Sequence, residues 1–194
     1  MIGIPLGLLA SNAGEWLIHK YLLHGRGKHK ESFWAFHWHA HHRASRRHGH
    51  YDSDYEDLRP TINPRTKEIG ALVGSALLYT PLLPVAPFFT LTVWYSHLKY
   101  YQVHKRSHLD PEWAREHLPW HYDHHMGPNQ DANWCVTRPW FDQIMGTREV
   151  YVGTDKELKN RDRDQERWEA RLNRTRRTPK KKAPGPKATP IRAA

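Results

Sequence analysis

Cysteine is almost absent from this chain, since its 194 residues include only Cys135. A single cysteine cannot form an intramolecular disulfide, and it excludes the zinc and iron–sulfur sites that several thiolates build. The HExxH motif of zinc peptidases is absent as well. Any metal chemistry must therefore depend on histidine, with carboxylates in support.

Histidine, by contrast, is abundant, with 16 residues. Ten of them fall in four short groups, here called the histidine boxes: His19-x4-His24, His37-x3-His41-His42, His104-x3-His108 and His121-x2-His124-His125. Imidazole is the commonest metal-binding side chain, and one site rarely needs more than three or four ligands. Ten ordered histidines therefore predict two metal ions close together, held almost wholly by nitrogen.

The spacing within each box suggests which histidines share a metal. Residues three and four apart lie on one face of an α-helix, so His104 pairs with His108. The last box also lies on one side of a helix, where its three rings converge on one metal or straddle two.

The first two boxes are less regular. His37 pairs with His41 by the same rule, whereas His42 lies about 100° further round and is expected to reach the second metal. His19 and His24 are five residues apart, so we expect them to bind different metals or to flank a distorted turn. Among the other six histidines, His39 is an alternative to His37. The rest are expected on the surface or in supporting hydrogen bonds: His29, His48, His50, His97 and His117.

Carboxylates near the boxes are candidates for orienting the ligand N–H groups. Those expected to act in this way are Glu15, Asp110, Asp123 and Asp142. None of them is expected to be a metal ligand itself.

Two apolar stretches flank the second box. Residues 1–23 form the first, and residues 69–94 form the second, 26 residues without a charged side chain. About 20 such residues suffice for a transmembrane helix, but Pro81, Pro84 and Pro87 favour a kink or a tight helical hairpin. The fold class we expect is all-α, a membrane-embedded helical domain with a cytoplasmic helical cap that carries the histidine boxes.

Composition divides the chain into three parts. Residues 1–154 are expected to form the metal-binding domain, and residues 155–177 a solvated helix with alternating charges. Residues 178–194 are expected to be a disordered basic tail. From Arg171 to the end there are nine Lys and Arg and no acid, which accounts for most of the net charge of +10. Basic residues also gather between the two apolar stretches, which favours a cytoplasmic position for that segment.

The four boxes together resemble the fatty acid hydroxylase / sterol desaturase superfamily of membrane-bound di-iron enzymes. That family's pattern is HX3–4H, HX2–3HH, HX3H and a final HX2–3HH, and all four occur here in this order. The family closes with an Asn, an aromatic–Asp pair and Gly-Thr. The similar residues here are Asn133-Trp134, Trp140-Phe141-Asp142 and Gly146-Thr147. The resemblance covers about residues 11–151.

The resemblance implies that the ten box histidines bind two iron ions, which zinc can replace during purification. The implied ligands are His19, His24, His37, His41, His42, His104, His108, His121, His124 and His125. The implied enzyme is an oxidoreductase that uses O2 to hydroxylate an unactivated C–H bond of a membrane lipid, fatty acyl or sterol-like. It has no catalytic residue beyond the metal ligands. Its partners are the lipid, the membrane and an external electron donor of the cytochrome b5 or ferredoxin type, and its active site faces the cytoplasm.

Other functions remain open on the sequence. A lipid desaturase and a carotenoid-type ring hydroxylase share this chemistry. A zinc hydrolase needs fewer histidines than are present. A non-enzymatic metal-binding or nucleic-acid-binding protein is a further alternative because the basic tail can hold phosphates. We do not expect nucleic acid as the partner, since nothing in the folded part resembles a base-reading module.

Overall fold

The computed structural model describes residues 2–56, 59 and 61–177, and every regular element in these ranges is helical. The α-helices are α1 (Gly3–Leu17), α2 (Arg43–Arg47), α3 (Pro64–Tyr79), α4 (Pro87–Leu109), α5 (Pro111–His117), α6 (Pro119–Met126), α7 (Trp140–Ile144) and α8 (Asp155–Arg177). Two π-helical segments, η1 (Ile18–Arg26) and η2 (His37–His42), and two 3-10 turns, η3 (Ser53–Tyr55) and η4 (Thr80–Leu82), complete the elements. The all-α prediction is confirmed.

The chain divides into two compact units, residues 1–154 and residues 155–194. The described part of the second unit is α8, a helix of 23 residues with ion pairs such as Arg167–Asp164 along its surface. The expected basic tail, residues 178–194, lies outside the described residues. The first unit contains all four histidine boxes.

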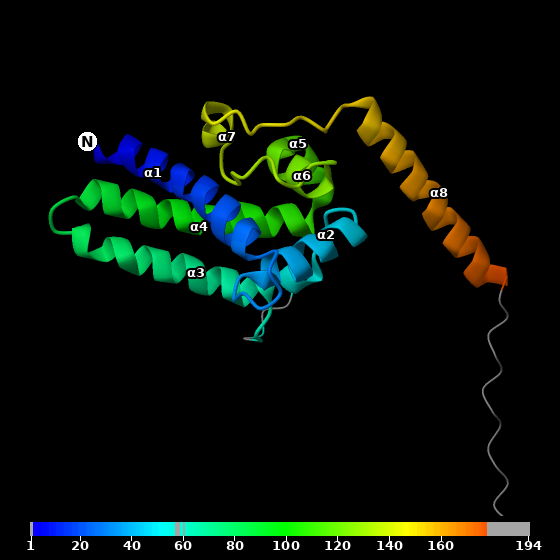
Figure 1. Cartoon of the computed structure of the whole chain (residues 1–194), viewed down its shortest axis with the longest axis horizontal. Helices are drawn as coiled ribbons and strands as arrows, with labels where there is room; N and C mark the ends of the chain where they lie inside the picture. The colour runs from blue at the N-terminus through cyan, green and yellow to red at the C-terminus, as the bar shows by residue number, and fades with distance from the viewer. Residues whose placement is uncertain (1, 57–58, 60, 178–194) are drawn as a thin grey trace, which may run out of the picture. The chain divides into compact units, whose positions relative to one another are not determined.

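Three long helices form the body of the first unit, with α4 between α1 and α3 (Figure 1). Two glycines of α1 allow it to approach α4 closely. A Cβ atom on Gly7 would lie 2.8 Å from the Cβ of Thr92, and one on Gly3 would lie 2.8 Å from the backbone nitrogen of Phe89. Because glycine has no Cβ, the two backbones can pack at this distance.

The prolines of the second apolar stretch form the turn of a helical hairpin, as predicted. Helix α3 ends at Tyr79, and α4 begins at Pro87, a position that tolerates proline because the first N–H groups of a helix have no partner within it. The turn divides the apolar stretch between two helices. No helix in the described part of the chain combines the length and the apolar character needed to cross a membrane. The membrane-embedded part of the predicted fold therefore remains a proposal.

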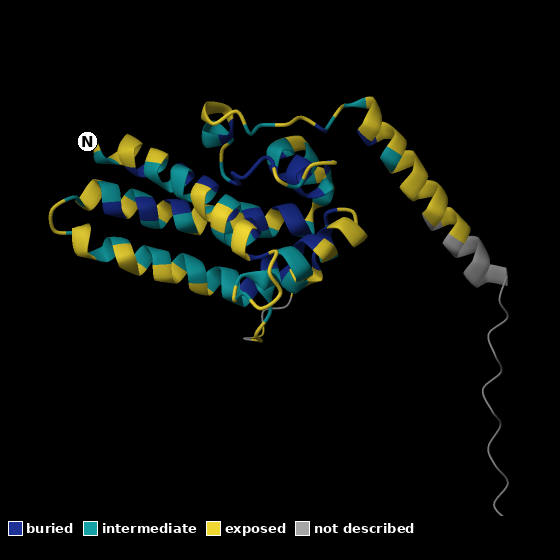
Figure 2. Ribbon diagram, viewed as in Figure 1, coloured by how far each residue is buried: buried dark blue, intermediate teal, exposed yellow. Residues whose placement is uncertain are grey.

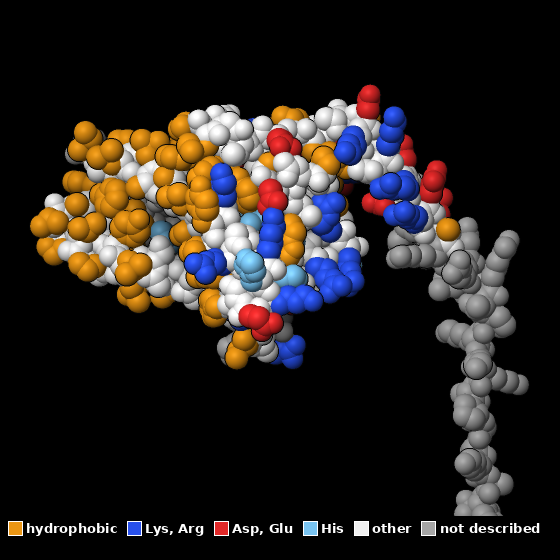
Figure 3. Space-filling model, viewed as in Figure 1, with side chains coloured by type: hydrophobic (Ala, Val, Ile, Leu, Met, Phe, Trp, Pro, Cys, Tyr) orange, Lys and Arg blue, Asp and Glu red, His pale blue; other side chains and the backbone are white. Residues whose placement is uncertain are grey.

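One end of the three-helix body carries exposed apolar side chains, and Lys and Arg gather at the other end on the face that Figure 3 shows. The most exposed apolar residues at this end are Ile2, Leu77, Leu78 and Val85, each at least 64% exposed. Contiguous apolar surface of this kind marks a site of contact with a membrane, a protein or a ligand.

The interior of the first unit is unusually polar. Its buried segments include parts of α4 and α6 (Figure 2). Its apolar clusters are small. One of them consists of Trp16, Trp134 and Cys135. Most of the largest fully buried side chains are imidazoles: His24, His41, His42, His50, His108, His121, His124 and His125. Burial of polar groups is costly unless they are hydrogen-bonded or bound to a metal, so this interior needs a partner for its nitrogens.

Candidate metal centre

The first cluster contains five histidines, one ligand nitrogen of each lying within 4.8 Å of all the others. Its members are His19, His24, His37, His42 and His124. They come from η1, η2 and α6, and every one of them is buried. Boxes far apart in the sequence therefore converge on one point.

The π-helical segments explain which residues of the first two boxes meet. Backbone hydrogen bonds in a π-helix join residues five apart, which brings such residues to one face. His19 and His24 have this spacing in η1, and His37 and His42 have it in η2. The structure thus places His19 and His24 in one cluster through a distorted helix, which is one of the two expected alternatives. Whether they bind different metals, the other alternative, stays a prediction. The expected pairing of His37 with His41 is wrong, because the π-helical spacing brings His37 to the same face as His42.

The second cluster consists of two overlapping groups that share His108. One group contains His41, His104, His108 and His125, and the other contains His50, His108 and His121. Helices α4 and α6 supply most of these rings, and η2 supplies His41. The last box straddles the two clusters, because His124 belongs to the first while His121 and His125 belong to the second.

The structure distinguishes His37 from His39. His37 is buried in the first cluster, and its Nε2 lies 2.9 Å from Nε2 of His19. His39 points away from the cluster, and its Nε2 lies 3.0 Å from the carbonyl oxygen of Lys28. Of the two alternatives, His37 is the one in a position to bind metal.

Rings of the first cluster are oriented through Nδ1. Four of the five donate this N–H to an oxygen within residues 130–134. The pairs are His19 with the Trp134 carbonyl (2.6 Å), His24 with Asp131 Oδ1 (3.2 Å), His42 with Gln130 Oε1 (2.9 Å) and His124 with the Ala132 carbonyl (2.6 Å). Metal-binding histidines characteristically donate the other ring N–H in this way.

Rings of the second cluster follow the same pattern with other acceptors. His41 donates Nδ1–H to Asp52 Oδ2 at 2.8 Å, and His104 donates to Glu68 Oε1 at 2.6 Å. His108 donates to the carbonyl oxygen of His50 at 2.8 Å. In these seven rings, Nε2 is therefore the atom that faces the cluster.

These hydrogen bonds fix the tautomer, and this tautomer leaves lone pairs that a cation can bind. A neutral ring that carries its proton on Nδ1 presents a lone pair at Nε2. Nε2 of His42 lies 3.0 Å from Nε2 of His24 and 3.1 Å from that of His124. No proton remains for a hydrogen bond between these atoms, so their lone pairs face each other. A metal ion between them would replace this repulsion with coordination, and the clusters can therefore hold metal.

Burial favours the neutral, metal-binding form of the rings. Loss of hydration lowers the pKa of His124 to about 4, and its hydrogen bond to Ala132 opposes part of that shift. Burial and the neighbouring imidazoles lower the pKa values of His19, His42 and His125 well below the ordinary value. Neutral imidazole is the form that binds metals.

The carboxylates that orient the rings are not those expected from the sequence. Asp52, Glu68 and Asp131 take this role. The four expected residues have other hydrogen-bond partners: Glu15 accepts from Val136 and Thr137, Asp110 caps α5, Asp123 pairs with Arg148, and Asp142 accepts from Trp134 and Cys135. Sequence distance from a box is a poor guide here, because the orienting groups lie on loops and on a neighbouring helix.

His50 lies closer to the second cluster than the sequence indicated. It is fully buried, and its ring centroid lies 4.5 Å from that of His108 in a stacked arrangement. Neither ring nitrogen has a hydrogen-bond partner among the described residues. Its φ of 82° is also rare for a residue with a side chain. No spacing signal pointed to His50, which stands eight residues after the second box.

Residues 132–147, which follow the last box, form a segment here called the strap, and it contacts the rings of the first cluster. Asp142 accepts hydrogen bonds from the backbone N–H groups of Trp134 and Cys135, both at 2.8 Å. It also accepts from the hydroxyl of Thr147 at 2.8 Å. These contacts aim the carbonyl of Trp134 at His19, and the residues of the expected closing signature thereby gain a physical role.

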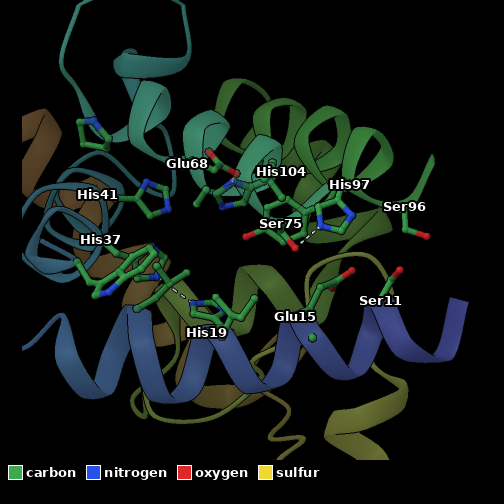
Figure 4. A pocket seen from close by; sticks show the side chains of 18 of the residues that line it. Ser11, Glu15, His19, His37, His41, Glu68, Ser75, Ser96, His97 and His104 are labelled. Atoms are coloured by element: carbon green, nitrogen blue, oxygen red, sulfur yellow. Dashed lines mark hydrogen bonds and ion pairs between the residues drawn. The ribbon is translucent and has the colours of Figure 1, made fainter. Parts of the chain in front are cut away.

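A narrow pocket of about 120 Å³ leads to both clusters between α1, α3 and α4. His19, His37, His41 and His104 line one end of it (Figure 4). Its walls are mainly apolar and aromatic, from residues such as Ile18, Leu72 and Val93. An apolar molecule of small cross-section can therefore reach the imidazoles.

Comparisons with family models, with curated proteins and with solved structures found no match to this chain. The family resemblance therefore depends on the histidine boxes and the closing residues alone.

Proposed function

We propose that this chain is a di-iron oxidoreductase that hydroxylates an unactivated C–H bond of a lipid with O2. The observation that carries the proposal is the pair of buried imidazole clusters, whose Nε2 atoms face inward beside an apolar pocket. The proposed family is the fatty acid hydroxylase / sterol desaturase superfamily.

Iron is proposed from the family resemblance, and the donor set is compatible with it. Imidazole suits zinc, copper, iron and nickel, so the ligands alone leave several metals open. Two clusters, each of four or more imidazoles, exceed what a hydrolytic zinc site needs. Bound iron would supply the redox chemistry, in which one oxygen atom enters the C–H bond and the other leaves as water, with two electrons and two protons from an external donor.

The chain's own residues hold and shield this centre. Asp52, Glu68 and Asp131 keep three rings in one tautomer, and the carbonyls of Ala132 and Trp134 do the same for two more. The apolar pocket keeps water away from the reacting C–H bond and aligns the substrate with the rings. Substrates that fit such walls are aliphatic, which favours a lipid.

Two features favour a membrane as the source of the substrate. The exposed apolar end of α1, α3 and α4 offers a surface that acyl chains can cover. Lys and Arg lie toward the other end, where lipid headgroups or an acidic electron donor of the cytochrome b5 or ferredoxin type would meet them. Desaturation of the same lipid is the alternative reaction, because both reactions begin with removal of one hydrogen atom.

Metal analysis of protein made in iron-replete cells tests the centre. We expect about two iron ions per chain, one for each cluster. In His125→Ala, which removes a ring of the second cluster, we expect the iron content to fall to about half. His39→Ala is the matched control, because this ring lies outside both clusters, and its iron content should equal that of the unaltered chain.

Retention of both irons in His125→Ala would contradict the assignment. Product analysis after feeding a lipid extract then separates hydroxylation from desaturation. If iron-loaded protein supplied with a reductant formed no O2-dependent product, the proposed reaction would be contradicted. The assignment of the metal sites would not be affected.

A further inference from the structure

The pocket has a polar end away from the metal clusters, and its hydrogen-bonding groups are those that recognise an alcohol. Ser11 and Glu15 line the pocket from α1, and His19 lines it from η1, which continues the same helical run. The three residues follow one another at intervals of four, so they lie toward one side of that run. Ser11 is eight residues before His19, which places its Cα about 12 Å from the Cα of His19 along the helix axis. Ser75, Ser96 and His97 face the same space from α3 and α4 (Figure 4).

Ser11 supplies a free donor to this end of the pocket. Its hydroxyl oxygen is buried and has no hydrogen-bond partner within the described part of the chain. A buried hydroxyl without a partner costs free energy, unless a ligand completes its hydrogen bonding.

The two serines opposite supply acceptors. His97 donates Nδ1–H to the carbonyl oxygen of Val93 at 2.7 Å, so Nε2 of the neutral ring accepts, and the hydroxyl of Ser75 donates to it at 2.9 Å. Ser96 donates its hydroxyl to the carbonyl oxygen of Thr92 at 2.8 Å. Both serine hydroxyls therefore donate their protons within the protein, and each oxygen keeps a lone pair that can accept a hydrogen bond from a ligand.

An anionic substrate group has no cationic partner at this end. No Lys or Arg is among the described residues that line the pocket. The nearest acid is Glu15, and both its oxygens already accept hydrogen bonds from Val136 and Thr137. A carboxylate here would meet another carboxyl group and no cation.

We infer that this polar end, here called the serine subsite, binds a hydroxyl group of the substrate, so the lipid that is oxidised carries an alcohol at the end of the pocket opposite the imidazoles. A hydroxyl both accepts from Ser11 and donates to Ser75 or Ser96, and so satisfies groups on both sides of the pocket. This inference rests on the proposed function for the identity of the other end of the pocket. It narrows the substrate class from any apolar lipid to an aliphatic alcohol.

Binding of three matched probes to the purified full chain tests the serine subsite, with calorimetric titration in a nonionic detergent as the measurement. The probes are n-octanol, heptyl methyl ether and octanoate. The ether has the same heavy atoms as the alcohol but cannot donate. We expect the alcohol to bind about fivefold more tightly than the ether, as one neutral hydrogen bond implies, and octanoate to bind most weakly.

Ser11→Ala should weaken both the alcohol and the ether by about fivefold, since both accept from Ser11. Ser53→Ala is the control, because this serine is exposed and lies outside the pocket. Equal binding of alcohol and ether, tighter binding of octanoate, or no effect of Ser11→Ala would each overturn the inference.

These results are independent of the proposed function. A chain that binds no iron but still prefers the alcohol would refute the oxidoreductase and leave the serine subsite in place. A chain that binds iron and oxidises lipids without preferring an alcohol would refute the serine subsite alone.

Discussion

In seven of the clustered histidines, His19, His24, His41, His42, His104, His108 and His124, the two ring nitrogens have different roles. Nδ1 donates to a carbonyl, an amide or a carboxylate oxygen, and Nε2 points into a cluster. The side-chain type could be read from the sequence, whereas the acceptors could not. Asp52 and Glu68 come from a loop and from α3, and no spacing relative to the boxes marks them.

His50 extends the second cluster beyond the ten box residues, and its replacement by glutamine tests this. We expect His50→Gln to weaken metal binding at the second cluster by about 10- to 100-fold and to leave the first cluster unchanged. The physical reason is that a buried ring without a hydrogen-bond partner, next to His108 and His121, is available for coordination or for support of those rings.

Competitive titration with a chelator measures the two affinities separately. His48→Gln is the matched control, since this neighbouring ring is exposed. If His50→Gln and His48→Gln released metal equally, His50 would be only a packed side chain.

At the scale of elements, two π-helical segments and one strap build the first cluster. The π-helical geometry turns a five-residue spacing into a shared face, which sequence rules for α-helices do not anticipate. The strap, residues 132–147, brings backbone carbonyls to His19 and His124. Both devices act through the backbone, so side-chain patterns alone predicted the boxes but not their pairing.

Asp142→Asn tests the strap. The carboxylate accepts hydrogen bonds from two backbone N–H groups, and in asparagine an NH2 group would face one of them, donor against donor. We therefore expect a loss of about 2–3 kcal/mol in the free energy of unfolding. Metal should be lost from the first cluster before the second, because the carbonyl of Trp134 depends on this contact.

Thermal unfolding and chelator titration give the two quantities. Gln143→Ala next to it is exposed and should change neither. If Asp142→Asn released metal from both clusters at the same chelator concentration and unfolded at an unchanged temperature, the strap would have no specific effect on the first cluster.

At the scale of the whole molecule, we expect a core of neutral imidazoles to make folding depend on pH and on metal binding. Burial lowers the pKa of these histidines, so the unfolded chain binds more protons than the folded chain does below about pH 6.5. Each such histidine removes about 1.4 kcal/mol of stability per pH unit as the pH falls through this window.

We therefore expect the metal-free protein to unfold cooperatively as the pH falls from 6.5 toward about 4, the pKa of His124. Metal-loaded protein should unfold at lower pH, because protons must then displace the metal as well. Circular dichroism across this range, with and without chelator, measures both midpoints. Identical midpoints would mean that metal does not bind the buried rings.

The sequence by itself determined the all-helical class, the hairpin at Pro81 to Pro87 and the four boxes, because these depend on local periodicity, on proline and on residue type. Only the tertiary structure decided which rings meet, that His50 joins them, and which oxygens hold them. Those outcomes depend on backbone geometry within η1 and η2 and on contacts between residues more than a hundred positions apart, such as His19 with Trp134. Local spacing contains no information on either.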